Sequence, residues 1–188
     1  MSDNSSVHAS AVLVGERAVL IRGPSGAGKS RLAFDLILAG RTGALPPAIL
    51  VGDDRVHLDT AGEQLWVRPA PQLAGLIEIR GLGIRHCPFA SEAMVGLIVD
   101  LAADDAERLP PPEALKSRLN GVLLPRLPVA AGFLPLPLVV AALTTTESSW
   151  SRNLAANCRE GIGNHITSTI APDFAGAASP LYRQEPGD

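Results

Sequence analysis

The sequence predicts a single α/β domain built around a P-loop, the glycine-rich loop that holds the phosphates of a nucleotide. Three observations predict this fold class: an apolar run over 18–21, a loop of the form G-x-x-x-x-G-K-S over 23–30, and helically spaced apolar residues over 30–39. In such a strand–loop–helix unit, the loop N–H groups and the helix N-terminus face the same anion. We therefore expect a nucleoside triphosphate to bind there.

The elements around the loop follow from apolar patterning and turn residues. Short apolar runs predict buried strands at 11–14, 18–22 and 48–51. The first two are joined by a short turn and form a hairpin that leads into the loop. The helix is predicted from Ser30 to Ala39, with Gly40 as its C-terminal cap.

The second half of the domain carries weaker signals. Further strands are predicted at 55–58, 64–68 and 93–101, and helical segments at 113–119 and 139–143. Turn-like residues over 59–62 join the first two of these strands. Threonine, serine, asparagine and glycine dominate from Thr144 onward, so we expect a domain over 1–143 and a flexible or loosely packed polar tail over 144–188.

Composition bounds the function classes. The 188 residues are 46% apolar and 19% charged, with a net charge of −3, so the chain lacks the basic footprint of a nucleic-acid-binding protein. The longest apolar stretch contains Gly132, Pro135 and Pro137 and is too short to cross a bilayer, so we expect no membrane segment. Two distant cysteines, Cys87 and Cys158, and a polar start without an apolar leader favour a reduced, cytoplasmic location.

The residue types of the loop predict its ligands. The expected nucleotide-binding residues are Gly23, Pro24, Ser25, Gly26, Ala27, Gly28, Lys29 and Ser30. Lys29 is expected to reach the β- and γ-phosphates, and the Ser30 hydroxyl to ligate Mg²⁺, so ATP and Mg²⁺ are the expected ligands. A P-loop alone does not distinguish a kinase from a hydrolase or a switch, and the acidic residues must define the reaction.

Asp53 and Asp54 follow a predicted strand and are the first acidic candidates. One carboxylate can hold Mg²⁺ while the other accepts a proton from an attacking hydroxyl. The alternative is a solvated turn, which is common after strands. The P-loop and the apolar strand before the pair favour the functional interpretation, without deciding which aspartate is the base.

Two further candidates have weaker local patterns. Glu78 lies inside an apolar run, either on the outer face of a strand together with Arg80 or as a second Mg²⁺ ligand. His8 precedes the first predicted strand in a polar segment, where an isolated histidine is usually a surface residue. The sequence contains no Cys/His cluster typical of a zinc site.

Three motifs in this order make the chain resemble the catalytic domain of bacterial HPr kinase/phosphorylase. They are the loop Gly-Pro-Ser-Gly-Ala-Gly-Lys-Ser, the segment Leu-Val-Gly-Asp-Asp-Arg-Val at 50–56 and the string Glu-Ile-Arg-Gly-Leu-Gly-Ile at 78–84. The third motif is much more specific to this family than the P-loop. The resemblance covers about 7–143, is strongest over 8–84, and is to the short proteobacterial form without a separate N-terminal domain.

The resemblance implies a P-loop kinase domain of the HPr kinase and phosphoenolpyruvate carboxykinase-like type. It also implies ATP- and Mg²⁺-dependent phosphorylation of a serine on an HPr-like phosphocarrier protein of a phosphotransferase system. In the family, the reverse reaction is attack of inorganic phosphate on the phosphoserine, which releases pyrophosphate. Long members assemble into hexamers through this domain, which makes a homo-oligomer one expectation for this chain.

The resemblance also implies site residues, position by position. The implied catalytic residues are His8, Lys29, Asp53, Asp54 and Arg108, and the implied metal ligands are Ser30, Asp53 and Glu78. His8 stands at the family's spacing before the P-loop lysine, and Arg108 matches a later active-site arginine. The Asp53–Asp54 motif contains the proton acceptor, which would become the proton donor in the reverse reaction.

The chain departs from the family at several places, including a longer loop before Leu50. Pro24 and Arg31 replace acidic residues of the usual pattern, and 128–133 replaces an arginine-rich motif that is important for dephosphorylation in long members. The last departure leaves the reverse reaction open. Two other function classes remain: a small-molecule kinase or carboxykinase-like enzyme that needs no protein substrate, and a non-catalytic nucleotide-sensing module. The string at 78–84 favours the protein kinase.

Overall fold

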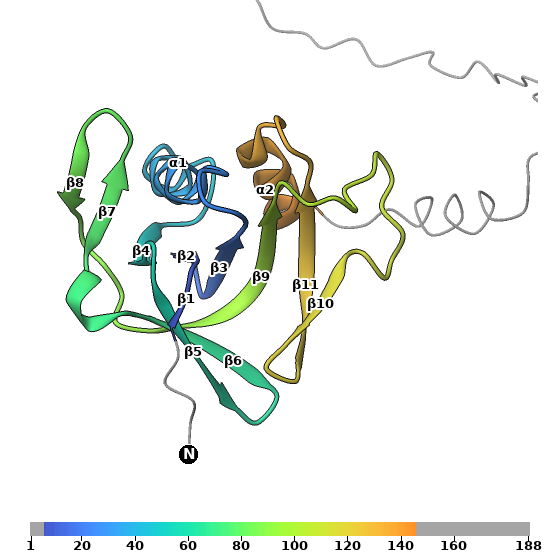
Figure 1. The fold of residues 1–188 in the computed structure, drawn as a ribbon, viewed down its shortest axis with the longest axis horizontal. Helices are drawn as coiled ribbons and strands as arrows, with labels where there is room; N and C mark the ends of the chain where they lie inside the picture. Colours follow the sequence, from blue (N-terminus) through green and yellow to red (C-terminus); the bar gives the residue numbers. More distant parts are fainter. Residues whose placement is uncertain (1–5, 146–188) are drawn as a thin grey trace, which may run out of the picture.

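The computed structural model describes residues 6–145. Figure 1 shows the helices and strands of this part of the chain. In chain order they are β1 (Ser6–Val7), β2 (Ser10–Val14), β3 (Arg17–Arg22), α1 (Lys29–Arg41), β4 (Ala48–Gly52), β5 (Val56–Ala61), β6 (Gln64–Pro69), the 3-10 helix η1 (Pro71–Leu73), β7 (Leu76–Ile79), β8 (Gly83–His86), β9 (Ala93–Leu101), β10 (Lys116–Leu119), β11 (Val122–Val129) and α2 (Pro135–Thr144).

A mixed sheet forms the centre of the fold. Its strands follow the order β1-β5-β6-β9-β3-β2-β4, and β11 pairs with both β9 and β10. β3, β9 and β11 run parallel, whereas the other pairs in the sheet are antiparallel. The carboxyl ends of the three parallel strands therefore lie at one edge of the sheet, where β3 continues toward α1 (Figure 1). The predicted α/β class is confirmed.

Strand β3 is buried on both faces because its alternate residues enter two different apolar clusters. Val19 and Ile21 pack in the cluster that includes the inner faces of α1 and α2. Ala18 and Leu20 pack in the cluster on the opposite face of the sheet. The strand that leads into the P-loop is thus held by packing from both sides.

Several sequence predictions are confirmed. The strands predicted at 11–14, 18–22, 48–51 and 93–101 correspond to β2, β3, β4 and β9, and the helical segment at 139–143 lies within α2. The turn predicted over 59–62 is shorter, because β5 extends to Ala61 and β6 begins at Gln64. Two residues therefore remain for this turn, and the first of them, Gly62, has a φ of +61°.

The helix predicted at 113–119 is wrong. Lys116–Leu119 is strand β10, which pairs antiparallel with β11. Asn120 and Gly121 join the two strands with φ angles of +48° and +84°. An Asn-Gly pair with positive φ is the typical turn of a two-residue hairpin, and this turn chemistry outweighs the weak helical pattern before it.

The predicted helix cap at Gly40 is also wrong. α1 continues to Arg41, and Thr42 caps it through its backbone N–H, which donates to the carbonyls of Leu38 and Gly40. Gly40 serves a packing role instead, since a Cβ there would lie 2.6 Å from the Ala48 nitrogen. The glycine thus allows the end of α1 to approach the start of β4.

Two predictions concern regions outside or at the limit of the described residues. Apart from Thr144 and Thr145, the predicted polar tail lies outside them, as does Cys158. Within residues 6–145, neither α1 nor α2 has both the length and the hydropathy that a transmembrane helix requires.

We expect Leu36→Ala to lower the free energy of unfolding by about 2–5 kcal/mol, because it removes a fully buried side chain and leaves a cavity under α1. Urea titration followed by circular dichroism measures this loss. Leu38→Ala in the same helix is the control, since Leu38 is 39% exposed and should cost much less. Equal losses in the two variants would contradict the assigned core.

Candidate functional site

The P-loop joins β3 to α1 through residues that need unusual backbone angles. Gly26 and Gly28 have φ angles of +79° and +96°, which favour glycine, and no atom lies within 4 Å of a Cβ built at either position. Gly23 is different, because a Cβ there would lie 2.8 Å from the Leu101 carbonyl oxygen. The start of the loop is therefore packed against the end of β9, while its middle borders open space.

The amino group of Lys29 lies inside the loop. Its Nζ donates to the carbonyl oxygens of Gly23 and Pro24, each at 3.0 Å, and the residue is 6% exposed. Burial lowers the pKa of Lys29, an effect partly opposed by the charges of Asp53 and Asp54. A buried ammonium next to a curved loop is suited to an anionic ligand, which would replace the two carbonyl contacts.

Asp53 lies directly after β4 and is almost completely buried, at 3% exposure. Its Oδ1 accepts a hydrogen bond from the Ser10 hydroxyl at 2.5 Å. Its Oδ2 accepts one from the Glu78 backbone N–H at 3.1 Å. Both oxygens are thus oriented by groups from β2 and β7, and the carboxylate lies close enough to affect the charge of Lys29.

Asp54 points in a different direction from Asp53 because the chain turns sharply between them. Asp54 has a φ of +65°, and the Arg55 N–H donates to the Asp53 carbonyl at 2.8 Å. The Asp54 carboxylate is 66% exposed and lies 3.2 Å from Nε2 of His8, which is 44% exposed. His8, which the family resemblance implies as an active-site residue, therefore lies beside Asp54.

Glu78 and Arg108 lie differently with respect to this cluster. Glu78 has an exposed side chain on β7, and its backbone N–H reaches Asp53. Arg80, its suggested partner on one strand face, lies in the turn after β7. Arg108 lies in the exposed loop between β9 and β10, where it forms no hydrogen bond or ion pair with any residue of 6–145.

The arrangement is suited to a metal ion that binds together with phosphates. In the described part of the chain, no group of three or more His, Cys, Asp or Glu side chains could hold a metal ion. Mg²⁺ is commonly held by one or two carboxylates, with phosphate oxygens and water completing its shell. Asp53 accepts a hydrogen bond from the Glu78 backbone N–H, and these two neighbouring residues have that number of carboxylates.

Sequence reasoning missed Ser10, which orients the Asp53 carboxylate. No local pattern marks Ser10, because its partner Asp53 lies 43 residues further along the chain. Because His8 contacts Asp54 and Ser10 contacts Asp53, the two consecutive aspartates are matched by two positions on the neighbouring segment.

Sequence reasoning also missed an ion-pair network beside the P-loop. Asp100, near the end of β9, accepts two hydrogen bonds of 2.7 Å from Arg22 and one of 2.5 Å from Arg126. Arg126 also binds Asp105 through two hydrogen bonds of 2.6 and 2.9 Å. Although burial alone would raise the pKa of Asp100, the hydrogen bonds from the two arginines bring this pKa below its ordinary value. The two positively and two negatively charged groups neutralise one another.

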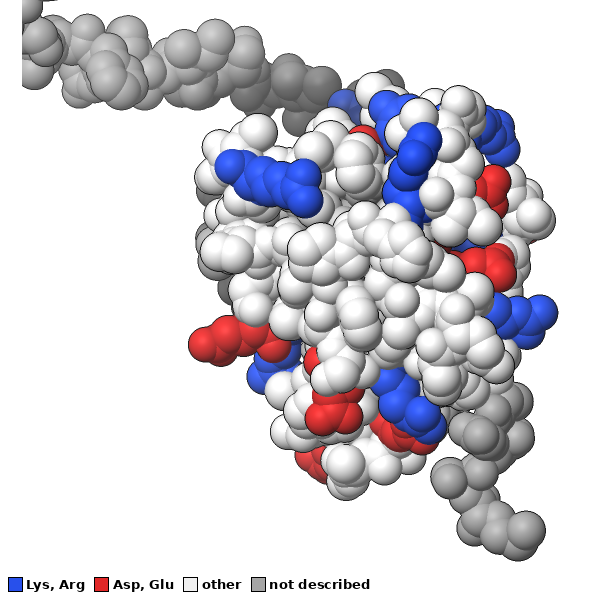
Figure 2. Space-filling model, turned by 90° about the vertical axis from the view of Figure 1, so that its left-hand side faces the viewer, with Lys and Arg blue, Asp and Glu red and all other residues white. Residues whose placement is uncertain are grey.

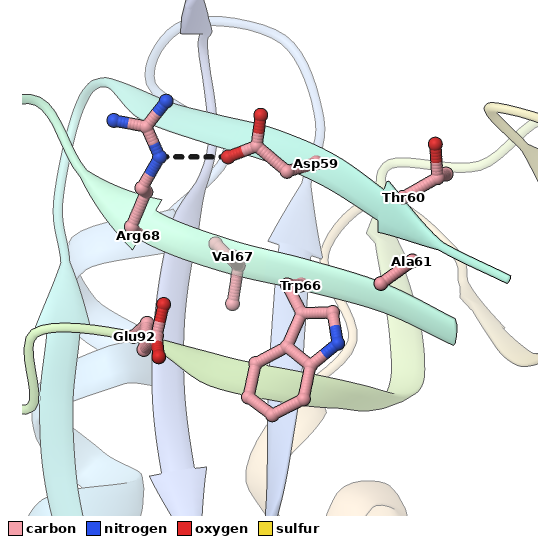
Figure 3. Close-up of a pocket in the computed structure, with 7 residues that line it drawn as sticks. All are labelled: Asp59, Thr60, Ala61, Trp66, Val67, Arg68 and Glu92. Atoms are coloured by element: carbon pink, nitrogen blue, oxygen red, sulfur yellow. Dashed lines mark hydrogen bonds and ion pairs between the residues drawn. The ribbon is translucent and has the colours of Figure 1, made fainter.

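Two surface hollows lie away from these residues. One, of about 280 Å³, lies on β5 and β6, where Trp66 and the ion pair of Arg68 with Asp59 form its wall (Figure 3). The other, of about 460 Å³, is mainly apolar and includes Arg41 and Cys87. Figure 2 shows the side that bears β7 and β8, where uncharged residues fill the centre and charged ones surround it. Neither hollow contains a predicted site residue. A phosphate site on the P-loop does not require such a hollow, because a loop of backbone N–H groups can bind an anion without a deep cavity.

Comparison with known proteins gives consistent results. The pattern of the HPr Serine kinase C-terminal domain matches residues 1–107. HPr kinase/phosphorylase from Exiguobacterium is 32% identical over 165 residues, which cover 80% of this chain and 51% of that protein. The Streptococcus thermophilus protein of the same name is 41% identical over 85 residues, covering 45% of this chain and 25% of the relative. The chain thus spans about half or less of these relatives.

A solved structure shares the fold. The Hpr(Ser) kinase/phosphatase from Coxiella burnetii superposes with a TM-score of 0.59 at 24% sequence identity. The match covers 82% of this chain and 99% of that one. The mixed sheet with its P-loop is therefore a fold already observed in a solved protein.

The pairing of Asp100 makes the stability of the fold pH-dependent. Although burial opposes them, hydrogen bonds from Arg22 and Arg126 hold the pKa of Asp100 below its ordinary value in the folded chain, so this carboxylate stabilises the fold at higher pH. The stabilisation is lost as the pH falls through the folded-state value, because the unfolded chain takes up a proton first. We expect the unfolding free energy of Asp100→Asn, measured in urea, to fall less steeply than that of the wild type from about pH 5 to about pH 3.

Asp104→Asn is the matched control, because Asp104 is exposed and forms no ion pair within residues 6–145. It should keep the wild-type pH dependence. A slope for Asp100→Asn equal to that of the wild type would show that Asp100 does not contribute to it.

Proposed function

This chain belongs to the HPr Serine kinase C-terminal domain family, and from that membership we propose that it transfers the γ-phosphate of ATP to a serine of an HPr-like phosphocarrier protein. The observation that carries the proposal is one cluster: Lys29 in the P-loop, the buried Asp53, and the exposed pair of Asp54 and His8. Phosphoryl transfer needs a positive charge at the phosphates and a proton acceptor that an incoming hydroxyl can reach.

ATP would bind with its phosphates on the P-loop. Lys29 exchanges its contacts with the Gly23 and Pro24 carbonyls for contacts with phosphate oxygens. Because burial disfavours the isolated ammonium and lowers the pKa of Lys29, an anion beside it favours the charged form and gains more than it would at an exposed lysine. The open space beside Gly26 and Gly28 leaves room for the phosphates at the loop N–H groups.

Ser30, Asp53 and Glu78 would hold Mg²⁺ with the nucleotide. When bound, the ion offsets the negative charge of the phosphates. Asp53 suits this role because Ser10 and the Glu78 N–H fix its two oxygens before any ligand arrives. Burial lowers the pKa of Lys29, and the same carboxylate opposes this effect and so favours the ammonium form.

Asp54 is the proton acceptor in this proposal. It is the exposed member of the pair, so a serine on the surface of another protein can approach it. His8 lies 3.2 Å from its carboxylate and can take the proton onward to solvent. In the reverse reaction, Asp54 returns the proton to the serine oxygen while inorganic phosphate takes the phosphoryl group and leaves as pyrophosphate.

Arg108 contributes positive charge to the transferred or incoming phosphate. It has no ion-pair partner in residues 6–145, so its guanidinium is available to an anion. A cytoplasmic location, expected from the cysteine content and the polar start, and assembly into homo-oligomers, expected from the family, belong to the same proposal.

The direct test is transfer of label from γ-labelled ATP with Mg²⁺ to a purified HPr-like carrier from the same source. We expect label on the wild-type carrier and none on a carrier in which the serine is replaced by alanine. Label on a metabolite without any carrier would favour a small-molecule kinase. ATP binding without any transfer would favour a nucleotide-sensing module.

We expect Lys29→Ala to weaken ATP binding and to abolish transfer, because it removes the ammonium that contacts the phosphates. Isothermal titration calorimetry and the transfer assay measure the two effects. Lys116→Ala is the control, since Lys116 is the other lysine of the sequence and is exposed on β10. Transfer by Lys29→Ala at the wild-type rate would refute the assigned phosphate site.

We expect Asp54→Asn to reduce turnover by about 10²-fold or more with ATP affinity nearly unchanged, as is usual when a general base is lost. Asp53→Asn should reduce turnover and also weaken the dependence of ATP binding on Mg²⁺, because it removes a proposed ligand. Kinetics and nucleotide titrations at several Mg²⁺ concentrations separate the two roles. Loss of Mg²⁺ dependence in Asp54→Asn alone would exchange the two assignments.

A further inference from the structure

Arg126 connects three parts of the chain near the carboxyl ends of the parallel strands. From β11, its guanidinium binds Asp100 on β9 and Asp105 in the loop of residues 102–115. Its Nη1 also donates to the Ala114 carbonyl at 3.0 Å, near the other end of the same loop. One side chain therefore contacts the loop at two points and the strand before it at a third.

The same network reaches the P-loop. Asp100 binds Arg22 through both carboxylate oxygens, and Arg22 immediately precedes Gly23. Gly23 in turn packs against the backbone of Leu101, so closely that a Cβ would overlap its carbonyl. The P-loop follows β3 and the loop of residues 102–115 follows the neighbouring β9. The ion pair of Arg22 with Asp100 joins the ends of these two strands.

The loop of residues 102–115 is also attached through its backbone at both ends. Its first residues turn through Ala102, with a φ of +55°, and Ala103 donates to the Val129 carbonyl at 2.9 Å. At its far end, the Arg126 N–H donates to the Leu115 carbonyl at 2.8 Å. Between these ends, Arg108 and Leu109 are exposed, and Leu109 is 67% exposed. The Asp105–Arg126 contact lies three residues before Arg108 and attaches this side of the loop to β11.

An arginine is required for these contacts. The Arg126 side chain is 13% exposed and the Asp100 side chain is 15% exposed, so both are largely buried. The planar guanidinium presents several N–H donors in fixed directions, so it can bind two carboxylates and a carbonyl together. A lysine ammonium would keep the charge but would lack this fork, and it would lose the paired hydrogen bonds to Asp105.

We propose that Arg126 is a positioning residue which, through Asp100 and Asp105, fixes the loop of residues 102–115, and with it Arg108, relative to the P-loop. This inference rests on the proposed function, because Arg108 is placed there as a contact of the phosphate. The partners of Arg126 use four of its five N–H donors, so in this proposal Arg126 positions Arg108 and does not itself bind the phosphate. Its effect on transfer is to fix the place from which Arg108 acts.

The test compares Asp105→Asn with Asp104→Asn in the full chain. Asp105 is 53% exposed, so its replacement should leave the fold intact, and the neighbouring Asp104 forms no ion pair within residues 6–145. The first readout is limited trypsin digestion, with mass spectrometry of the fragment that ends at Arg108. We expect cleavage in Asp105→Asn to be about tenfold faster than in the wild type, because local opening exposes the bond. Asp104→Asn should match the wild type.

The second readout is phosphate transfer to the carrier. Asp105→Asn should lower kcat by about tenfold and leave the KM for ATP within about twofold, since the misplaced group acts on the transferred phosphate and not on nucleotide binding. Arg126→Lys, which keeps the charge, should fall between the wild type and Arg126→Met. A purely structural role would change KM and kcat together or neither.

Unchanged cleavage and unchanged kcat in Asp105→Asn would overturn the proposal. Faster cleavage with an unchanged kcat would also overturn it, because the loop would then be attached without positioning Arg108 for transfer. If the wild type transfers no phosphate to the carrier, the proposed function fails. The cleavage rates then test only whether the Asp105–Arg126 contact holds the loop of residues 102–115. Equal cleavage rates in Asp105→Asn and Asp104→Asn would refute that claim.

Discussion

The burial of the Asp53 carboxylate is the constraint on which the arrangement of the site depends. A charged group at 3% exposure is costly unless polar groups surround it, and here the partners come from Ser10 on β2 and the Glu78 N–H on β7. Those contacts fix the position of the β7–β8 hairpin relative to β4, and they hold β2 so that His8 lies beside Asp54. One buried charge thus orders three segments that are distant in the sequence.

The parallel strands impose a second order. Because β3, β9 and β11 end at the same edge, the P-loop, the loop after β9 and the segment that leads to α2 all begin there. Ligand sites of open α/β sheets lie at such edges, where helix N-termini and loops converge. Gly23 packs closely on Leu101, and the Asp100 carboxylate binds both Arg22 and Arg126. These contacts join the ends of β3 and β9 to β11.

The sequence predicted those parts of the fold that depend on local chemistry. The P-loop, the strands around it and the Asp53–Asp54 turn each have a pattern within a few residues, and the fold class followed from them. The hairpin of β10 and β11 was missed because Asn120-Gly121 was not recognised as its turn. Gly40 was misassigned because its reason for being glycine, the approach to Ala48, is a tertiary contact. Ser10 and the Arg22–Asp100–Arg126 network were missed for the same reason, since their partners lie 26 to 78 residues apart.

The separation of β7 and β8 from the main sheet has a consequence for the dynamics of the site. Two-stranded sheets are only marginally stable alone, and β8 is exposed along its whole length. The backbone amides of β8 should therefore exchange with deuterium through local opening, long before those of β9 exchange through global unfolding. The Glu78 amide belongs to the same hairpin, yet it is bonded to a buried carboxylate. The hydrogen-exchange rate of the Glu78 amide would report how often the hairpin detaches from Asp53. It would therefore also report how often Asp53 and Glu78 separate while no ligand is bound.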